Sequence, residues 1–121
     1  MAAGSSRSGV LAQVAQYFKV LSEVSRLQLL CELGAGAKNV TELLAATGMG
    51  QANVSKHLKI LSDAGMVSRH PKGVSVYYQL SDPACLRLCQ VVCQQLLNQH
   101  QRQSQTLEQL SSLQQLGANP D

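Results

Sequence analysis

Within residues 39 to 80, two short helical patterns are separated by only two residues, and an alternating pattern follows them. The stretch "NVTELLAATG" starts with a capping residue, Asn39 or Thr41, and ends at Gly48, as a short helix does. Only Met49 and Gly50 separate it from "QANVSKHLKIL", whose apolar residues recur at helical spacing. Two short helices joined by a tight turn that contains glycine predict a helix-turn-helix, whose second helix enters the major groove of DNA.

A pattern typical of a β-hairpin follows this unit. The second helix of the helix-turn-helix should end near Ala64 and Gly65. The segments "MVSR", "HPKG" and "VSVYYQL" follow in that order, and the last of them alternates apolar with polar residues. We expect two strands, with Pro71 and Gly73 supplying the turn between them. A basic hairpin directly after a helix-turn-helix is a wing, so the segment predicts a winged helix-turn-helix.

The flanking residues predict a mainly α fold with this one small β-hairpin. Apolar residues at helical spacing indicate a helix over residues 9–21 and a second over 23–33, the latter capped by Ser22. After the hairpin, "SDPACLRLCQVVCQQLL" indicates a fifth helix with Ser81 as its cap and Pro83 in its first turn. The first and fifth helices build neither the DNA-reading helix nor the wing, so we expect them to form the interface of a homodimer.

A chain of 121 residues has room for one domain. We expect a flexible tail over residues 1–8 and a DNA-binding and dimerisation domain over 9–97. Residues 98–121 should form a glutamine-rich helical extension with a frayed end, for which low-complexity disorder is the alternative. No apolar run reaches the roughly 20 residues that cross a bilayer, and the N-terminus lacks the apolar stretch of a signal peptide. These features predict a cytoplasmic protein with no membrane partner.

The positive charge of the chain is concentrated in the helix-turn-helix and the hairpin. The formal net charge is +3, and the segment from Gly50 to Gly73 holds Lys56, Lys59, Arg69 and Lys72 against the single acidic residue Asp63. The rest of the chain is balanced, so the whole excess lies where a polyanion would bind. The alternative is a basic surface that is merely solvated.

The order of these segments, with four words of sequence, resembles one family of DNA-binding proteins. The words "RLQLLCEL", "QANVSKHLKIL", "AGMV" and "VYYQLSDP" occur at the spacings found in the ArsR/SmtB family of winged-helix repressors, and the resemblance covers about residues 10 to 97. It implies a homodimer that represses by occupying a palindromic operator on double-stranded DNA and lets go when an inducer binds.

The outward face of the second helix of the helix-turn-helix suits DNA. A helical wheel puts Val54, Leu58 and Leu61 on the core side, and His57 near the core edge, where a structural role is favoured over DNA contact. Amides can bridge adenine edges, a hydroxyl can contact bases or phosphates, and lysines neutralise phosphate. We expect DNA contacts from Gln51, Ala52, Asn53, Ser55, Lys56 and Lys59 on this helix and from Arg69 and Lys72 on the hairpin. The resemblance assigns base reading to Gln51, Ala52, Ser55 and Lys56.

Two metal sites known in the family are tested directly by the residues present. The site on the third helix needs a Cys-x-Cys pair, which "NVTELLAATG" lacks. The zinc site on the last helix has its first ligand in Asp82, but Ala84, Gln95 and Asn98 occupy the other positions. A carboxylate alone does not hold zinc, which takes four ligands drawn largely from His and Cys. Neither site is therefore expected.

The four cysteines leave three possibilities, none of which requires a resident cofactor. Cys31 resembles the first cysteine of the persulfide-sensing branch of the family, and Cys93 lies one helical turn before the second, where Leu97 stands. This resemblance implies a sensor pair, Cys31 and Cys93, that responds to sulfane sulfur or an oxidant. Alternatively, Cys85, Cys89 and Cys93 form a stripe on one helix whose neighbouring pairs could bind a thiophilic metal or metalloid ion such as As(III). The third possibility is that the cysteines only pack the core of an inducer-independent regulator.

Two other classes of function fit the sequence less well. An enzyme is not expected, because the three histidines are scattered and no nucleotide-binding glycine loop, HExxH or GxSxG motif is present. A winged-helix module that binds protein instead of DNA is the closer alternative, since a fold does not fix a function. Such a module would carry an apolar or acidic reading helix, whereas this one holds the excess positive charge.

Overall fold

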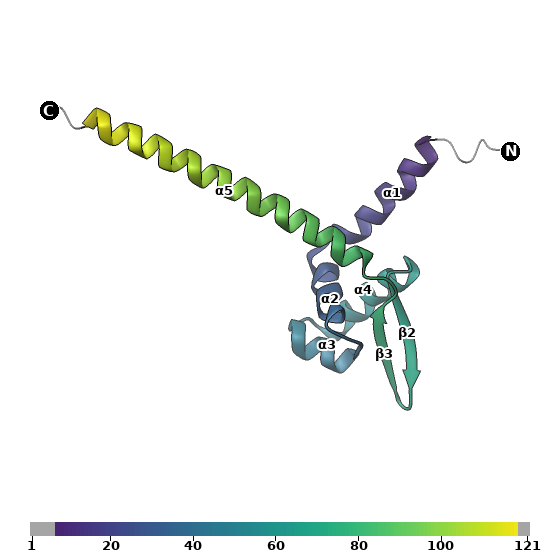
Figure 1. The fold of residues 1–121 in the computed structure, drawn as a ribbon. Helices are drawn as coiled ribbons and strands as arrows, with labels where there is room; N and C mark the ends of the chain where they lie inside the picture. The colour runs from purple at the N-terminus through teal and green to yellow at the C-terminus, as the bar shows by residue number, and fades with distance from the viewer. Residues whose placement is uncertain (1–6, 119–121) are drawn as a thin grey trace. The chain divides into compact units, whose positions relative to one another are not determined.

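The computed structural model describes residues 7–118 and consists of helices with one small sheet (Figure 1). The elements are α1 (Arg7–Leu21), α2 (Val24–Gly34), β1 (Lys38–Asn39), α3 (Val40–Thr47), α4 (Gln51–Asp63), β2 (Val67–Lys72), β3 (Ser75–Leu80) and α5 (Ala84–Ala118). The chain forms two compact units that divide between Leu86 and Arg87, and each is described by itself. Among the described residues no helix is both long enough and apolar enough to span a membrane.

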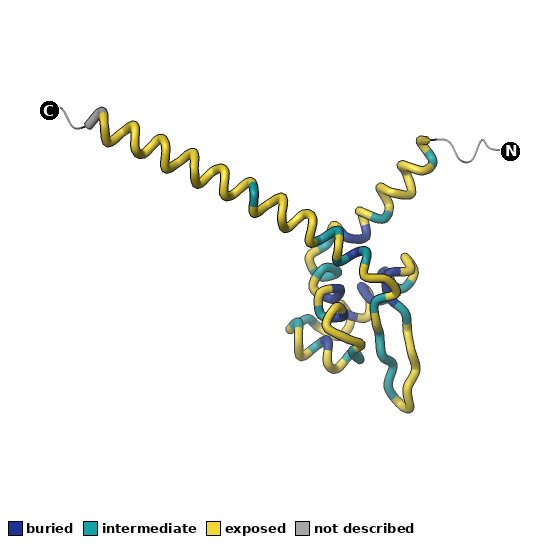
Figure 2. Tube along the Cα trace, in the orientation of Figure 1, coloured by how far each residue is buried: buried dark blue, intermediate teal, exposed yellow. Residues whose placement is uncertain are grey.

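The core of the first unit lies where α2, α3 and α4 meet (Figure 2). Its fully buried side chains are Leu29, Leu30, Leu43, Val54, Leu58, Leu61 and Cys85. Burying one such leucine stabilises the fold by about 1.5–3 kcal/mol relative to leaving it exposed. These residues come from α2, α3 and α4 and, in the case of Cys85, from the start of α5, so α4 is fixed by apolar contacts along one whole face.

The ends of the helices are fixed by local hydrogen bonds. Asn39 and Glu42 form a capping box at the start of α3: the Glu42 amide donates to Asn39 Oδ1 over 2.9 Å, and the Asn39 amide donates to Glu42 Oε1 over 3.0 Å. The predicted cap of α2 was wrong, because Glu23 takes that place and accepts from the Ser25 amide. Ser22 instead donates its hydroxyl hydrogen to the carbonyl of Lys19, so it closes α1 rather than opening α2.

The sheet has three strands in the order β1-β3-β2, one more than the predicted hairpin. The two residues of β1 pair with β3, Lys38 opposite Tyr78 and Asn39 opposite Tyr77, so the wing (Val67–Leu80) is joined to the start of α3. The turn between β2 and β3 is Gly73–Val74, with Gly73 at φ +63°, as the first position of a type II′ turn requires. Pro71 was expected in this turn but lies in β2, an edge strand, where a missing N–H is tolerated.

Helix α5 runs without a break from Ala84 to Ala118. Asp82, not the predicted Ser81, accepts a hydrogen bond from the Ala84 amide at its start, over 2.7 Å. The glutamine-rich residues up to Ala118 are helical, as the expected extension requires, and they continue α5. Gly117 and Ala118 are helical although fraying was expected from Gly117 onward. The expected tail at residues 1–6 and the last three residues lie outside the described part, and Arg7 and Ser8, expected in that tail, are already in α1.

Candidate nucleic-acid interface

Helix α4 has one buried and one exposed face, as the helical wheel predicted. Val54, Leu58 and Leu61 are at most 1% exposed. The exposed side chains of the helix are the six expected to contact DNA and the acidic Asp63 at its end; the six are Gln51, Ala52, Asn53, Ser55, Lys56 and Lys59. The buried face anchors α4 in the core, so the exposed face is presented on a rigid support.

The two lysines of this face differ in their surroundings. Lys59 Nζ lies 3.3 Å from Asp63 Oδ2, one turn further along α4, and both side chains are well exposed. Lys56 makes no ion pair with any residue between Arg7 and Ala118. The exposed face of α4 therefore offers one unopposed positive charge and one that is partly neutralised.

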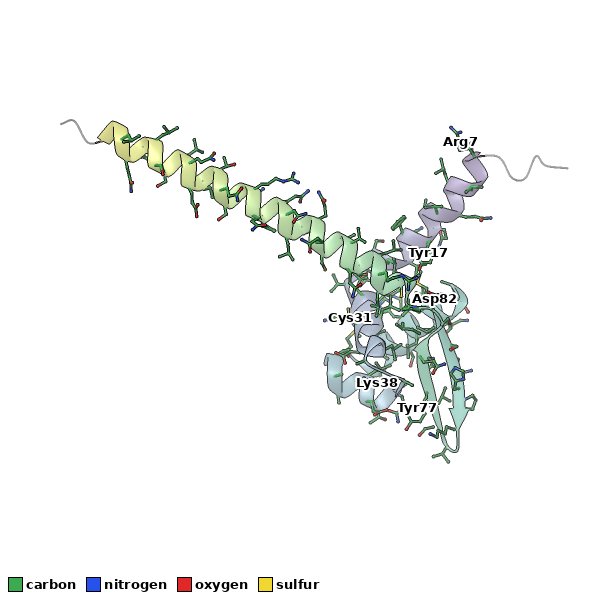
Figure 3. All side chains as sticks on the ribbon, in the orientation of Figure 1. Arg7, Tyr17, Cys31, Lys38, Tyr77 and Asp82 are labelled. Atoms are coloured by element: carbon green, nitrogen blue, oxygen red, sulfur yellow. The ribbon has the colours of Figure 1, made fainter. Side chains whose placement is uncertain are left out.

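The basic side chains of the wing are held by tyrosines. Arg69 Nε donates to the hydroxyl of Tyr78, its partner across the strands, over 3.3 Å, and its guanidinium carbon lies 6.0 Å from the centre of that ring. Lys72 Nζ lies 5.8 Å from the centre of the Tyr77 ring (labelled in Figure 3). These cation–π contacts restrict the two cations without neutralising them. Tyr77 and Tyr78 were not among the predicted site residues, although the alternation of β3 could have placed them opposite β2.

His57 lies on the inner side of α4 and is 5% exposed, which confirms the structural role favoured for it. Its Nδ1 lies 3.2 Å from Nη1 of Arg26 in α2. Burial lowers the pKa of His57 below its ordinary value of about 6.5, and the positive charges of Arg26 and Lys56 lower it further, while Glu23 acts in the opposite direction. His57 is therefore neutral at pH 7, and its Nδ1 can accept a hydrogen bond from Arg26.

The four cysteines have different surroundings, and none of them is in a disulfide. Cys31 is exposed on α2 (Figure 3), beside a cavity of about 300 Å³ that Leu27, Ala46 and Thr47 also line. Cys85, at the start of α5, is buried, with Sγ 3.8 Å from the Asp82 carbonyl oxygen. Cys89 is half-buried and Cys93 exposed, both in the second unit.

The predicted thiol stripe on α5 is thus buried at one end and exposed at the other. Within residues 7–118, no three His, Cys, Asp or Glu side chains gather closely enough in one chain to hold a metal ion. Cys85 packs in the core of the first unit, which makes it the least accessible of the three to an ion. The assignment of Cys85, Cys89 and Cys93 to a metal or metalloid remains a prediction.

The sequence of this chain is similar to those of known proteins. Residues 23–69 match the model of the bacterial regulatory protein arsR family. The chain is 36% identical over 81 residues to the arsenical resistance operon repressor of Bacillus subtilis, a match that covers 64% of this chain and 74% of that repressor. The chain belongs to the ArsR family. It is accordingly a DNA-binding transcriptional repressor and not an enzyme.

Solved structures that are similar to this chain have the same fold. The homodimeric winged helix-turn-helix DNA-binding domain of a possible ArsR-family regulator from Mycobacterium bovis is 34% identical, with a TM-score of 0.68, covering 81% of this chain and 95% of that one. Reduced HlyU from Vibrio cholerae is 26% identical, with a TM-score of 0.64, covering 70% and 90%. The predicted family and the winged helix-turn-helix are confirmed, and the homodimer agrees with the M. bovis structure.

Proposed function

We propose that this ArsR-family repressor binds a palindromic operator through α4 and the wing of each subunit and is released by a thiol-directed signal. The proposal of a DNA-binding surface rests on the exposed face of α4. This face has amides, a hydroxyl and an unopposed lysine, and it lies opposite a fully buried apolar stripe. The whole excess positive charge of the chain lies on this helix and the wing. Regulation of this kind takes place in the cytoplasm.

The exposed residues of α4 and those of the wing have different roles in DNA recognition. Gln51 and Asn53 have the donor and acceptor geometry to bridge an adenine edge, and the Ala52 methyl group can meet a thymine methyl. Ser55 and Lys56 contact bases or phosphates, and Lys59 adds positive charge once it leaves Asp63. Arg69 and Lys72 contact the phosphate backbone or the adjacent minor groove, so they set affinity more than sequence preference.

The homodimer forms through α1 and α5. Val10, Leu11, Val14 and Phe18 are helical neighbours on α1 and are 44–58% exposed in the single chain. Helix α5 likewise exposes Val92 and Leu96. Apolar side chains spaced along one helix and left in water indicate a missing partner. The M. bovis relative is a homodimer, and a second copy of this chain is the partner that a palindromic operator requires.

The signal acts on Cys31 and Cys93. Both thiols are exposed, so both can be reached by a small reagent. A persulfide donor would transfer one sulfur atom to the Cys31 thiolate and leave as a thiol. Attack by Cys93 on the inner sulfur would then form a disulfide and release hydrogen sulfide; peroxide would take the same two electrons and leave as water. HlyU of V. cholerae has been solved in a reduced form, which supports a redox-dependent state in this fold.

A thiophilic metalloid is the second candidate signal, because the B. subtilis relative is an arsenical resistance repressor. As(III) would bind two of Cys85, Cys89 and Cys93, with a further sulfur from Cys31 or the other subunit. The burial of Cys85 favours the pair Cys89 and Cys93 within this set. A regulator without an inducer, in which the cysteines only pack, is the third candidate.

The DNA-binding surface is tested by titrating binding to an operator duplex against salt. Lys56→Ala and Lys72→Ala should each weaken binding and lower the salt slope by about 0.9 per subunit, the value for one phosphate contact, and so by about 1.8 for the homodimer. Lys19→Gln, on α1, removes the same charge outside the proposed surface and should leave the slope unchanged. An unchanged slope in Lys56→Ala or Lys72→Ala would remove that residue from the interface.

The signal is tested by a gel shift with sulfane sulfur, peroxide, As(III) and Cd(II) added separately. Sulfane sulfur or peroxide should release DNA from the wild type and not from Cys31→Ser or Cys93→Ser. Release by As(III) that is lost in a Cys89→Ser, Cys93→Ser double variant, with no release by sulfane sulfur or peroxide, would favour the metalloid instead. If none of the four reagents releases DNA, the regulator does not sense through its cysteines.

A further inference from the structure

Arg26 in α2 connects three helices of the first unit through its guanidinium group. Nε donates to the carbonyl of Val20 over 2.6 Å, and Nη2 donates to the carbonyl of Lys19 over 3.4 Å. Nη1 lies 3.2 Å from Nδ1 of His57 in α4. One side chain therefore joins the last turn of α1 to the inner face of the helix proposed to read DNA.

The contacts suit a guanidinium better than any other side chain. The last carbonyls of a helix have no partner within it and carry partial negative charge, so a cation with several donors satisfies them. The planar fork of arginine can serve the end of α1 and His57 at the same time, whereas a lysine offers a single ammonium group. Among the described residues, His57 is a polar side chain that is buried in the core. Its hydrogen bond is therefore largely shielded from water, and losing the partner there is costly.

We infer that Arg26 is a positioning residue for DNA recognition, which holds α4 in its DNA-binding orientation by fastening His57 to the end of α1. This inference rests on the proposed contact of α4 with DNA. It gives a role in DNA binding to Arg26, which is not itself part of the proposed DNA-binding surface. Neighbours of His57 on α4, Asn53 and Lys56, are exposed on the same helix, so a tilt of α4 at His57 moves them. Because α1 is one of the two proposed dimer helices, the same contacts tie the orientation of α4 to the dimer interface.

Protonation of His57 provides a way to break the connection without a mutation. An imidazolium has no lone pair for Arg26, and it would face the positive charges of Arg26 and Lys56, with Glu23 as the opposing negative charge. Acid should therefore release α4 from Arg26. Added positive charge ordinarily strengthens DNA binding, so a loss of affinity on acidification has the opposite sign to the general electrostatic effect.

The experiment measures operator affinity by fluorescence anisotropy at about pH 7.5 and about pH 5.5, at fixed salt, with circular dichroism to check folding. Arg26→Met should lose roughly tenfold in affinity, and Arg26→Lys should recover part of it. Wild type should bind more weakly at the lower pH. His57→Gln, which keeps an oxygen for Arg26 but does not titrate, should not. Lys19→Gln is the matched control, because it removes a nearby cation and keeps the carbonyl that Arg26 uses.

Each outcome decides the inference. If folded Arg26→Met binds within twofold of wild type, or if His57→Gln loses affinity in acid as wild type does, Arg26 does not position α4. If Arg26→Met fails to fold, the pH profiles of wild type and His57→Gln decide instead. Failure of wild type to bind duplex DNA at either pH would overturn the proposed function, whereas binding by wild type with no effect of these variants overturns this inference alone.

Discussion

Asp63 is the one acidic residue among the positive charges of α4 and the wing, and removing it should strengthen DNA binding. At about 10 Å from a phosphate, its carboxylate repels that phosphate by about 0.4 kcal/mol in water, which screening at roughly 0.1 M salt reduces to about 0.15 kcal/mol. Releasing Lys59 from an exposed i,i+4 ion pair adds about 0.3–0.5 kcal/mol. Asp63→Asn should therefore raise operator affinity about two- to threefold for each subunit, or about four- to ninefold for the homodimer, and steepen the salt slope by up to about 0.9 per subunit.

The substitution should not harm the fold, which makes the result easy to interpret. Asp63 is the last residue of α4, where a negative charge is unfavourable to the helix dipole. We would measure the dissociation constant by anisotropy across a salt series for wild type, Asp63→Asn and Asp63→Asn with Lys59→Met. Glu108→Gln, in the second unit, makes the same change in net charge and should leave affinity unchanged. An affinity of Asp63→Asn equal to or below that of wild type would refute the electrostatic argument for α4.

Three further predictions concern the fold that supports this surface. Leu58→Ala, at a side chain 1% exposed, should lower the free energy of unfolding by about 2–5 kcal/mol in urea, while Lys59→Ala should change it by less than about 0.5 kcal/mol. Gly73→Ala places a Cβ at φ +63° and should lower the free energy of unfolding by about 1–2 kcal/mol, with weaker operator binding. A variant as stable as wild type would show that the turn has another conformation. Because the pKa of His57 is lowered in the folded state, the unfolded chain binds more protons below about pH 6.5. Stability should therefore fall as pH drops from about 6.5 through the lowered pKa, and His57→Gln should remove this part of the pH dependence.

Periodicity was sufficient to predict most of this fold. The spacing of Val54, Leu58 and Leu61 determined which face of α4 is buried, and the alternation around Tyr77 predicted β3. The pattern of α4 reflects burial of one face, which is the largest energetic term along that helix, whereas the residues of β3 are half-buried on both faces apart from the exposed Gln79. The exposed residues of α4 follow from the same wheel, so the placement of the proposed DNA-binding face could also be predicted.

Contacts between residues distant in the sequence could not be predicted in this way. The bond between Arg26 and His57 joins residues from two helices, and nothing in either helical pattern indicates that they meet. Strand β1 has only two residues, too few for an alternating pattern. The cap of α2 was misassigned because Ser22 and Glu23 are adjacent and both can cap, and only the backbone at the end of α1 selects between them.

The short strand β1 bears on how many substitutions the wing can accept. Lys38 and Asn39 are aligned with Tyr78 and Tyr77 by strand pairing, and Asn39 also caps α3, so peptide groups aim the wing relative to the helix-turn-helix. Hydrogen bonds between peptide groups do not depend on the identity of the outward side chains. The outward residues near the tip of the wing can thus be exchanged in evolution while the hairpin keeps its direction, which would change the strength of the proposed backbone contacts and not the placement of the wing.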